Sequence, residues 1–200
     1  MATEKVIKDL EKLVKQYIEL TISDVRVEAT EMFDKNFQRE AFFNEKWARR
    51  KFNDDDTRNI LTKNGTLRTS ITSRVEGSKI VFETVVPYAS IHNEGGIITV
   101  TKKMKMFFRA KFYEAQGITK KTRKKNLKEK KRVLSDGGFY AWTQKMKLTK
   151  EAEFYRAMAL KPIGSKIVIP KRQFIGNHPE LEAAILEIAG KNAIKIFKDV

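Results

Sequence analysis

The sequence contains no cysteine, only two histidines and only four prolines. The lack of cysteine excludes disulfides, thiolate-bound zinc and cysteine nucleophiles, and it suits a reducing compartment. No apolar run approaches the roughly 18 residues that a membrane span requires. The N-terminal segment mixes charged and apolar residues and does not form the apolar core of a signal peptide. We therefore expect a soluble protein that is made in a cytoplasm, contacts no membrane and has few options for binding a metal.

Positive charge is concentrated in one part of the chain. The net charge is +16, but residues 102–132 alone hold fourteen Lys and Arg against two Glu, which leaves only +4 for all other residues. A Lys-rich run with few large apolar residues buries too little surface to fix its own structure. We expect residues 102–160 to be a basic, partly helical insertion within a single domain that spans residues 1–200.

The Lys-rich run is a candidate contact for nucleic-acid phosphates or an acidic partner. Its basic residues are Lys120, Lys121, Arg123, Lys124, Lys125, Lys128, Lys130, Lys131 and Arg132. The nearby aromatic residues could stack on bases: Phe107, Phe108, Phe112 and Tyr113. However, Met104, Phe108 and Phe112 recur every four residues, which is typical of a small helix that is buried against its own domain. We therefore expect the aromatic side chains of this segment in the core and its lysines on the surface.

Apolar periodicity predicts helices at both ends of the chain. Spacings of three and four residues indicate one helix over about residues 3–21 and another over about 25–43. A charged surface loop follows, with Trp47 as its candidate anchor. Near the C-terminus, Pro179 suits the first turn of a helix, with glutamates near its start and lysines near its end.

The central segments alternate between apolar and polar residues and predict strands. Residues 64–86 indicate a β-hairpin that includes Leu67 and turns at Gly77. Further strand patterns precede residue 102 and follow residue 163, and Pro170 ends the second of these because proline cannot donate to a ladder. The pattern predicts an α+β domain: an antiparallel sheet with N-terminal and C-terminal helices and the long basic insertion.

The stretch VPYASIHNEGG, residues 86–96, contains the clearest candidate for chemistry. His92 and Glu94 could polarise a water molecule, but no neighbouring residue supplies a nucleophile or a second acid. A metal site that adds His178 lacks typical ligand spacing. The acidic run at residues 54–56 and the glycine pairs match no cation loop and no phosphate loop. No enzyme signature and no cofactor follow, and a metal-dependent hydrolase built on His92 and Glu94 is a remote alternative.

An architectural interpretation of the same stretch is stronger. Pro87 suits the first turn of a short helix, and Tyr88 is a packing anchor on that helix. Gly95 and Gly96 can adopt the positive φ that ends a helix and turns the chain. In this interpretation His92 holds a corner by hydrogen bonds and transfers no protons.

Three motifs in a fixed order resemble those of the virion morphogenesis and tail-completion family of tailed bacteriophages. The resemblance covers about residues 1–100 and 162–200. It departs from the family at Gln173, where a second proline is usual, and at the long basic segment. The matching residues are Gly65, Leu67, Arg68, Ser70 and Ile71 in the first motif; Pro87, Tyr88, Ala89, His92 and Gly95 in the second; and Pro170, Arg172, Phe174 and Gly176 in the third.

The resemblance implies a structural protein of the virion neck, made in the cytoplasm of a bacterial host. Such a protein completes the tail or joins it to the head as copies in a closed ring, and it is not an enzyme. Its partners would be other copies of the chain and adjoining neck, connector or tail-tube proteins. The basic segment would contact a neighbouring subunit, an adjoining protein or packaged DNA. A non-specific nucleic-acid-binding protein that uses residues 102–132 is the alternative.

Overall fold

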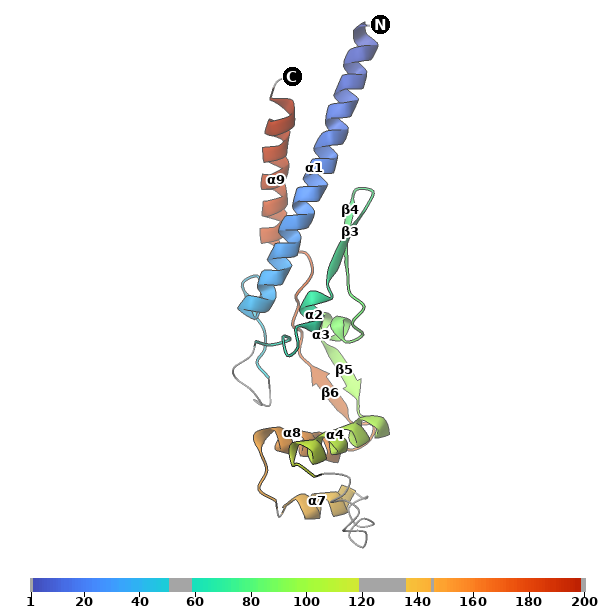
Figure 1. Ribbon diagram of the computed structural model, residues 1–200, viewed down its shortest axis with the longest axis vertical. Helices are drawn as coiled ribbons and strands as arrows, with labels where there is room; N and C mark the ends of the chain where they lie inside the picture. Colours follow the sequence, from blue (N-terminus) through green and yellow to red (C-terminus); the bar gives the residue numbers. More distant parts are fainter. Residues whose placement is uncertain (1, 51–58, 119–135, 145, 199–200) are drawn as a thin grey trace. The chain divides into compact units, whose positions relative to one another are not determined.

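The computed structural model describes residues 2–50, 59–118, 136–144 and 146–198 (Figure 1). The chain divides into two compact units. The first unit comprises Met1–Arg49, Arg58–Gly95 and Pro170–Val200, and the second comprises Arg50–Thr57 and Gly96–Ile169. The acidic run at residues 54–56 and the basic run at residues 120–132 lie outside the described residues.

The first unit begins with one long helix, α1 (Ala2–Arg39), where the sequence predicts two helices. The prediction was wrong at residues 21–25, because this segment contains no Gly or Pro to break a helix. Its polar side chains bind the C-terminal helix instead: buried Asn192 donates from Nδ2 to Asp24 Oδ2 at 2.9 Å. The predicted end was also late, since α1 stops before Glu40, which has a positive φ of 53°.

The C-terminal helix α9 (Pro179–Phe197) is confirmed. His178 is its N-cap, with Nδ1 accepting a hydrogen bond from the Glu180 amide at 3.2 Å, and Pro179 occupies the first turn. Helices α1 and α9 lie side by side and run in opposite directions (Figure 1). Leu181 of α9 packs in a core cluster with Ala29 and Phe33 of α1.

The predicted hairpin is confirmed in part. Strands β3 (Thr72–Glu76) and β4 (Lys79–Glu83) pair antiparallel, and Gly77 in the two-residue turn has a φ of 61°. The strand does not extend back to Leu67, because residues around it form a short helix, α2 (Thr66–Thr69). The predicted short helix of the second motif is present as α3 (Ala89–Glu94).

The described residues of the second unit form a strand pair and three helices. Strands β5 (Gly96–Thr99) and β6 (Lys166–Ile169) pair antiparallel, and Pro170 directly follows β6, as expected. Helix α4 (Lys102–Ala115) is confirmed, and the chain also forms α8 (Lys150–Leu160). Helix α7 (Asp136–Gln144) was missed, because the sequence carries a glycine pair at its start.

Aromatic side chains form the core of the three helices in the second unit. Phe112 and Phe139 are both fully buried there, which confirms the expectation that the aromatic side chains of α4 form core. Phe107 is an exception, since it is exposed. The expectation that the lysines lie on the surface was wrong for Lys105, which is buried and donates from Nζ to the carbonyl of Lys161 at 2.8 Å.

The α+β class is confirmed, but the predicted single sheet is not. In the described parts of the chain the strands form three separate antiparallel pairs: β3 with β4, β5 with β6, and the two-residue strands β1 (Ala41–Phe42) and β2 (Glu45–Lys46). Helix α2 replaces the start of the first predicted hairpin strand, and α3 lies between β4 and β5, which the sequence pattern treats as neighbours. Each pair therefore has two open edges.

Candidate assembly joint at the three motifs

The first motif clamps α2 to α1 through an ion pair. Arg68 of α2 donates from Nε and Nη2 to the two carboxylate oxygens of Asp34 of α1, and the Nη2–Oδ2 distance is 2.6 Å. This two-point hydrogen bonding fixes both side chains more tightly than a single contact would. The hydrogen bond from Arg68 lowers the pKa of Asp34, and the same bond raises the pKa of Arg68.

The second motif requires glycine where α3 ends. Gly95 has φ 76° and ψ 176°, a conformation that essentially only glycine adopts. A Cβ at this position would lie 3.0 Å from the backbone nitrogen of Lys171. The second and third motifs therefore meet backbone to backbone at this point. Gly96 is the first residue of β5, and the prediction of a positive φ there is not met, since only Gly95 of the pair has one.

His92 contributes to this meeting point with its backbone. Its carbonyl accepts a hydrogen bond from the Arg172 amide at 2.7 Å. The imidazole Nδ1 is buried and has no hydrogen-bond partner among the described residues, so the side chain does not hold the corner in the way the sequence suggested. Burial lowers the pKa of His92, and the nearby positive charge of Arg172 lowers it further. The imidazole is thus held in its neutral form and packs edge-on against Tyr88, with ring centroids 5.9 Å apart.

The third motif is tied to the loop that follows α1. Arg172 is buried and donates from Nε to the Ala48 carbonyl at 2.9 Å and from Nη2 to the Arg49 carbonyl at 3.4 Å. Trp47 donates from Nε1 to the Gln173 carbonyl at 2.7 Å. The predicted anchor role of Trp47 is confirmed, since its side chain is buried. Each of the two segments, residues 47–49 and 172–173, therefore donates side-chain hydrogen bonds to backbone carbonyls of the other.

Two asparagines complete the bonding of the third motif. Asn93 accepts at Oδ1 from the amides of Phe174 at 2.9 Å and Ile175 at 3.1 Å. Fully buried Asn36 donates from Nδ2 to the Phe174 carbonyl at 3.2 Å and accepts at Oδ1 from the Phe43 amide at 2.9 Å. Sequence reasoning missed both residues. The signal at Asn36 was an amide within the apolar stripe of a helix, where an unpaired polar group would be costly.

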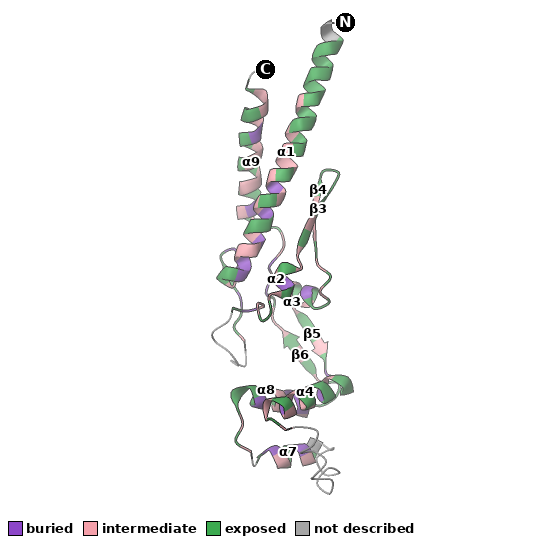
Figure 2. Cartoon of the chain, in the orientation of Figure 1, coloured by how far each residue is buried: buried purple, intermediate pink, exposed green. Residues whose placement is uncertain are grey.

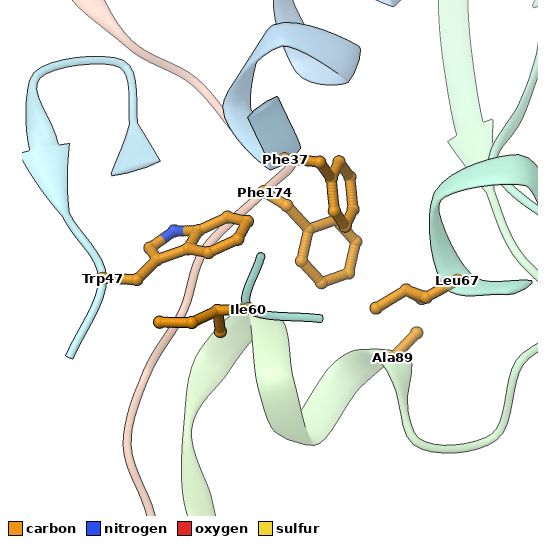
Figure 3. Packing of buried hydrophobic residues seen from close by; sticks show 6 residues of the cluster. All are labelled: Phe37, Trp47, Ile60, Leu67, Ala89 and Phe174. Atoms are coloured by element: carbon orange, nitrogen blue, oxygen red, sulfur yellow. The ribbon is translucent and has the colours of Figure 1, made fainter. Parts of the chain in front are cut away.

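Each motif also supplies one buried side chain to a single apolar cluster, shown in Figure 3. Leu67 comes from the first motif, Ala89 from the second and Phe174 from the third. They pack with Phe37, Trp47 and Ile60. The Phe37 ring centroid lies 5.2 Å from that of Phe174 and 5.7 Å from that of Trp47, where the two rings meet edge to face. We call the three motifs with these partners the motif junction.

The motif junction is built to hold its parts together. Pro87 and Tyr88 are exposed before α3. Leu67, Ala89 and Phe174 pack in the apolar cluster, and Arg68, His92 and Arg172 form hydrogen bonds within the first unit. Within the described part of the chain, no three His, Asp or Glu side chains gather in a way that could hold a metal ion. His178 stacks on Phe43, with ring centroids 4.0 Å apart, and caps α9, so both of its roles are structural.

Comparison with protein families identifies the chain. Residues 38–193 match the model of the phage virion morphogenesis family, and this range contains all three motifs. The chain belongs to that family. No curated protein and no solved structure matches it.

Membership settles the broad role of the protein. This phage protein is a structural component of the virion and not an enzyme. The short name of the family model describes its members as phage tail proteins. Its partners include other virion proteins. No described helix is long and apolar enough to cross a membrane.

Proposed function

We propose that this protein completes the phage tail and joins it to the head at the virion neck, acting as copies in a closed ring. The observation that carries the proposal is the motif junction. Three motifs that are far apart in the sequence meet in one packed and hydrogen-bonded structure, within a family of structural virion proteins. The junction is suited to fixing a subunit's shape for repeated assembly, because the buried side chains of Asn36 and Arg172 are held by specific partners.

The strand pairs provide further support for assembly. In β5–β6, Ile97 and Val168 are cross-strand partners, and both side chains are largely exposed. An isolated pair of strands is only marginally stable in water, and its open edges can pair with another chain. Contacts between ring subunits or with an adjoining neck, connector or tail-tube protein would cover such a surface. Ring closure requires heterologous contacts whose rotation returns to the starting subunit.

Electron microscopy of particles from a phage that lacks this gene tests the proposal. We expect full heads and separate tails that remain unjoined, and restoration of joined particles when the intact gene is supplied in trans. Normal infectious particles without the protein would contradict the role. A defect confined to tail length, with heads and tails still joined, would contradict the joining function.

A second candidate function is non-specific DNA contact through the basic segment. It is favoured by the exposed face of α4, where Phe107 lies one helical turn from the exposed Lys103. Most of the charge, from Lys120 to Arg132, is outside the described residues. Electrostatic binding weakens steeply with salt. DNA binding by the purified protein that falls with salt, and is lost when Lys120–Arg132 are neutralised, would support this function; binding unaffected by either change would exclude it.

A further inference from the structure

The loop before α2 contains a peptide bond that is open to spontaneous chemistry. Asn64 is followed by Gly65, and none of the other asparagines in the chain precedes a glycine. Asn64 is exposed. Neither its side-chain amide nor the backbone amide of Gly65 forms a hydrogen bond among the described residues. Asparagine is a thermally labile residue, and glycine has no Cβ to hinder attack by its own backbone nitrogen.

The reaction that this pair permits needs only water. The backbone nitrogen of Gly65 bonds to Cγ of Asn64, and a solvent base carries its proton to the side-chain nitrogen, which leaves as ammonia. Water then opens the resulting cyclic imide at one of its carbonyl carbons. Attack at Cγ gives aspartate on an intact main chain. Attack at the main-chain carbon gives isoaspartate, in which the main chain runs through Cβ and Cγ and is one carbon longer.

The loop that holds Asn64 is fixed at both ends. Ile60 before it and Leu67 after it are buried in the same apolar cluster. Figure 2 shows α2, which carries Leu67, beside α3, which also contributes to that cluster. The Gly65 carbonyl accepts a hydrogen bond from the Thr69 amide at 2.9 Å, so the start of α2 is fixed as well. An additional main-chain carbon at residue 64 therefore has to fit between two fixed points.

We propose that Asn64 is a site of spontaneous modification and that its isoaspartate product loosens the first motif. The added carbon moves α2 relative to Ile60, which weakens the packing of Leu67 and the ion pair between Arg68 and Asp34. The aspartate product only replaces an exposed amide by an exposed carboxylate, so it leaves this packing intact. The inference concerns the chemistry of the folded chain and does not depend on the neck role.

Peptide mass spectrometry of the full-length protein, aged while folded in mildly alkaline buffer, tests the modification. Asn177 is the internal control, since it is also exposed but precedes His178. We expect Asn64 to convert at least about tenfold faster than Asn177, because Gly65 lacks the Cβ that His178 carries. The two products have the same mass, so methylation by an isoaspartate-specific methyltransferase measures the isoaspartate. Equal conversion at the two asparagines, or none at Asn64, would overturn the proposal.

Urea unfolding tests the effect on the first motif. The unfolding midpoint of the aged wild-type protein should shift to lower urea as isoaspartate accumulates. Asn64→Ser aged in parallel should keep its midpoint, because serine cannot form the imide. Freshly prepared Asn64→Asp should match fresh wild type, because it carries the aspartate product on an intact main chain. An equal shift in aged Asn64→Ser, or an unchanged midpoint in wild-type protein rich in isoaspartate, would overturn the link to the first motif.

Discussion

The amide of Arg172 donates to the carbonyl of His92 at 2.7 Å, and this bond joins the second and third motifs. The Arg172 guanidinium meanwhile reaches the carbonyls of Ala48 and Arg49. One residue therefore ties together three segments that are remote in sequence. The stability of the motif junction should depend on such residues more than on any single apolar contact.

Replacement of Arg172 by alanine should lower the free energy of unfolding by about 2–3 kcal/mol. The substitution leaves two carbonyls without their donors at a buried site. Arg172→Lys should recover only part of this loss, because an ammonium cannot reproduce the planar fork of a guanidinium. Urea unfolding measures both values. Arg74→Ala serves as the control, since Arg74 is exposed and solvent screens its ion pairs with Glu76 and Glu83, so this substitution should cost much less. Equal losses at Arg172 and Arg74 would contradict the assignment.

Alanine at Gly95 should destabilise the protein, whereas alanine at Gly190 should not. At Gly95 the added Cβ meets the Lys171 backbone in a conformation that disfavours side chains, so we expect a loss of about 2 kcal/mol or more. Gly190 lies within α9 with open space around it, so alanine should add about 0.5–1 kcal/mol of stability. Thermal unfolding of both variants gives the comparison. A Gly95→Ala protein as stable as wild type would show that the Lys171 backbone does not lie this close to Gly95 in solution.

Asparagine 93 should be replaceable by aspartate but not by alanine. Its Oδ1 accepts from two backbone amides, and a carboxylate oxygen can do the same. Asn93→Ala leaves both amides without an acceptor and should lower the free energy of unfolding by about 2–3 kcal/mol. Asn93→Asp should stay within about 1 kcal/mol of wild type near neutral pH. If the two variants lose the same stability in urea unfolding, the acceptor role is wrong.

His92 should make the protein less stable in mild acid. Its pKa is lowered in the folded state, by burial first and by Arg172 second, so the unfolded state binds the proton more readily. Stability is therefore full above the unfolded pKa of about 6.5 and declines as the pH falls below it. Unfolding free energies measured from pH 7.5 to pH 5 should show this decline in wild type and a smaller one in His92→Gln. The second histidine is present in both proteins, so the difference isolates His92. Parallel pH profiles would contradict the prediction.

Protonation of Asp34 should cause a second decline in the stability of the protein, at lower pH than that of His92. The hydrogen bond from Arg68 holds the pKa of Asp34 below its ordinary value, so the pair stabilises the fold above about pH 3.8 and loses this effect as the pH falls further. Asp34→Asn should remove this acid-dependent part. Both side chains are about a third exposed or more, so the contribution is modest. If the free energy of unfolding of Asp34→Asn fell in acid as steeply as that of wild type, the ion pair would not contribute to stability.

The elements that sequence predicted well are those with strong local signals. Pro179 and the acidic residues after it placed the start of α9, and the turn at Gly77 placed the hairpin. The errors occurred where local patterns compete with tertiary contacts. Residues 66–69 alternate like a strand, yet they form α2, because Leu67 is buried in the junction and Arg68 binds Asp34.

The sequence revealed the three motifs of the motif junction but not the contacts that bring them together. Its motifs could be found, but their convergence depends on Asn36, Asn93 and Trp47, whose bonds reach across 81 to 138 residues of chain. No local spacing encodes such distances. The sequence also favoured a side-chain role for His92, whereas the backbone carbonyl makes the bond that joins the motifs.

Antibody labelling of purified virions in the electron microscope tests the central claim most directly. The claim is that this chain is a structural part of the assembled neck. We expect label at the joint between head and tail of intact particles, and none on the same particles after competition with the free protein. Absence of the protein from purified virions, or label confined to sites away from the joint, would contradict the account.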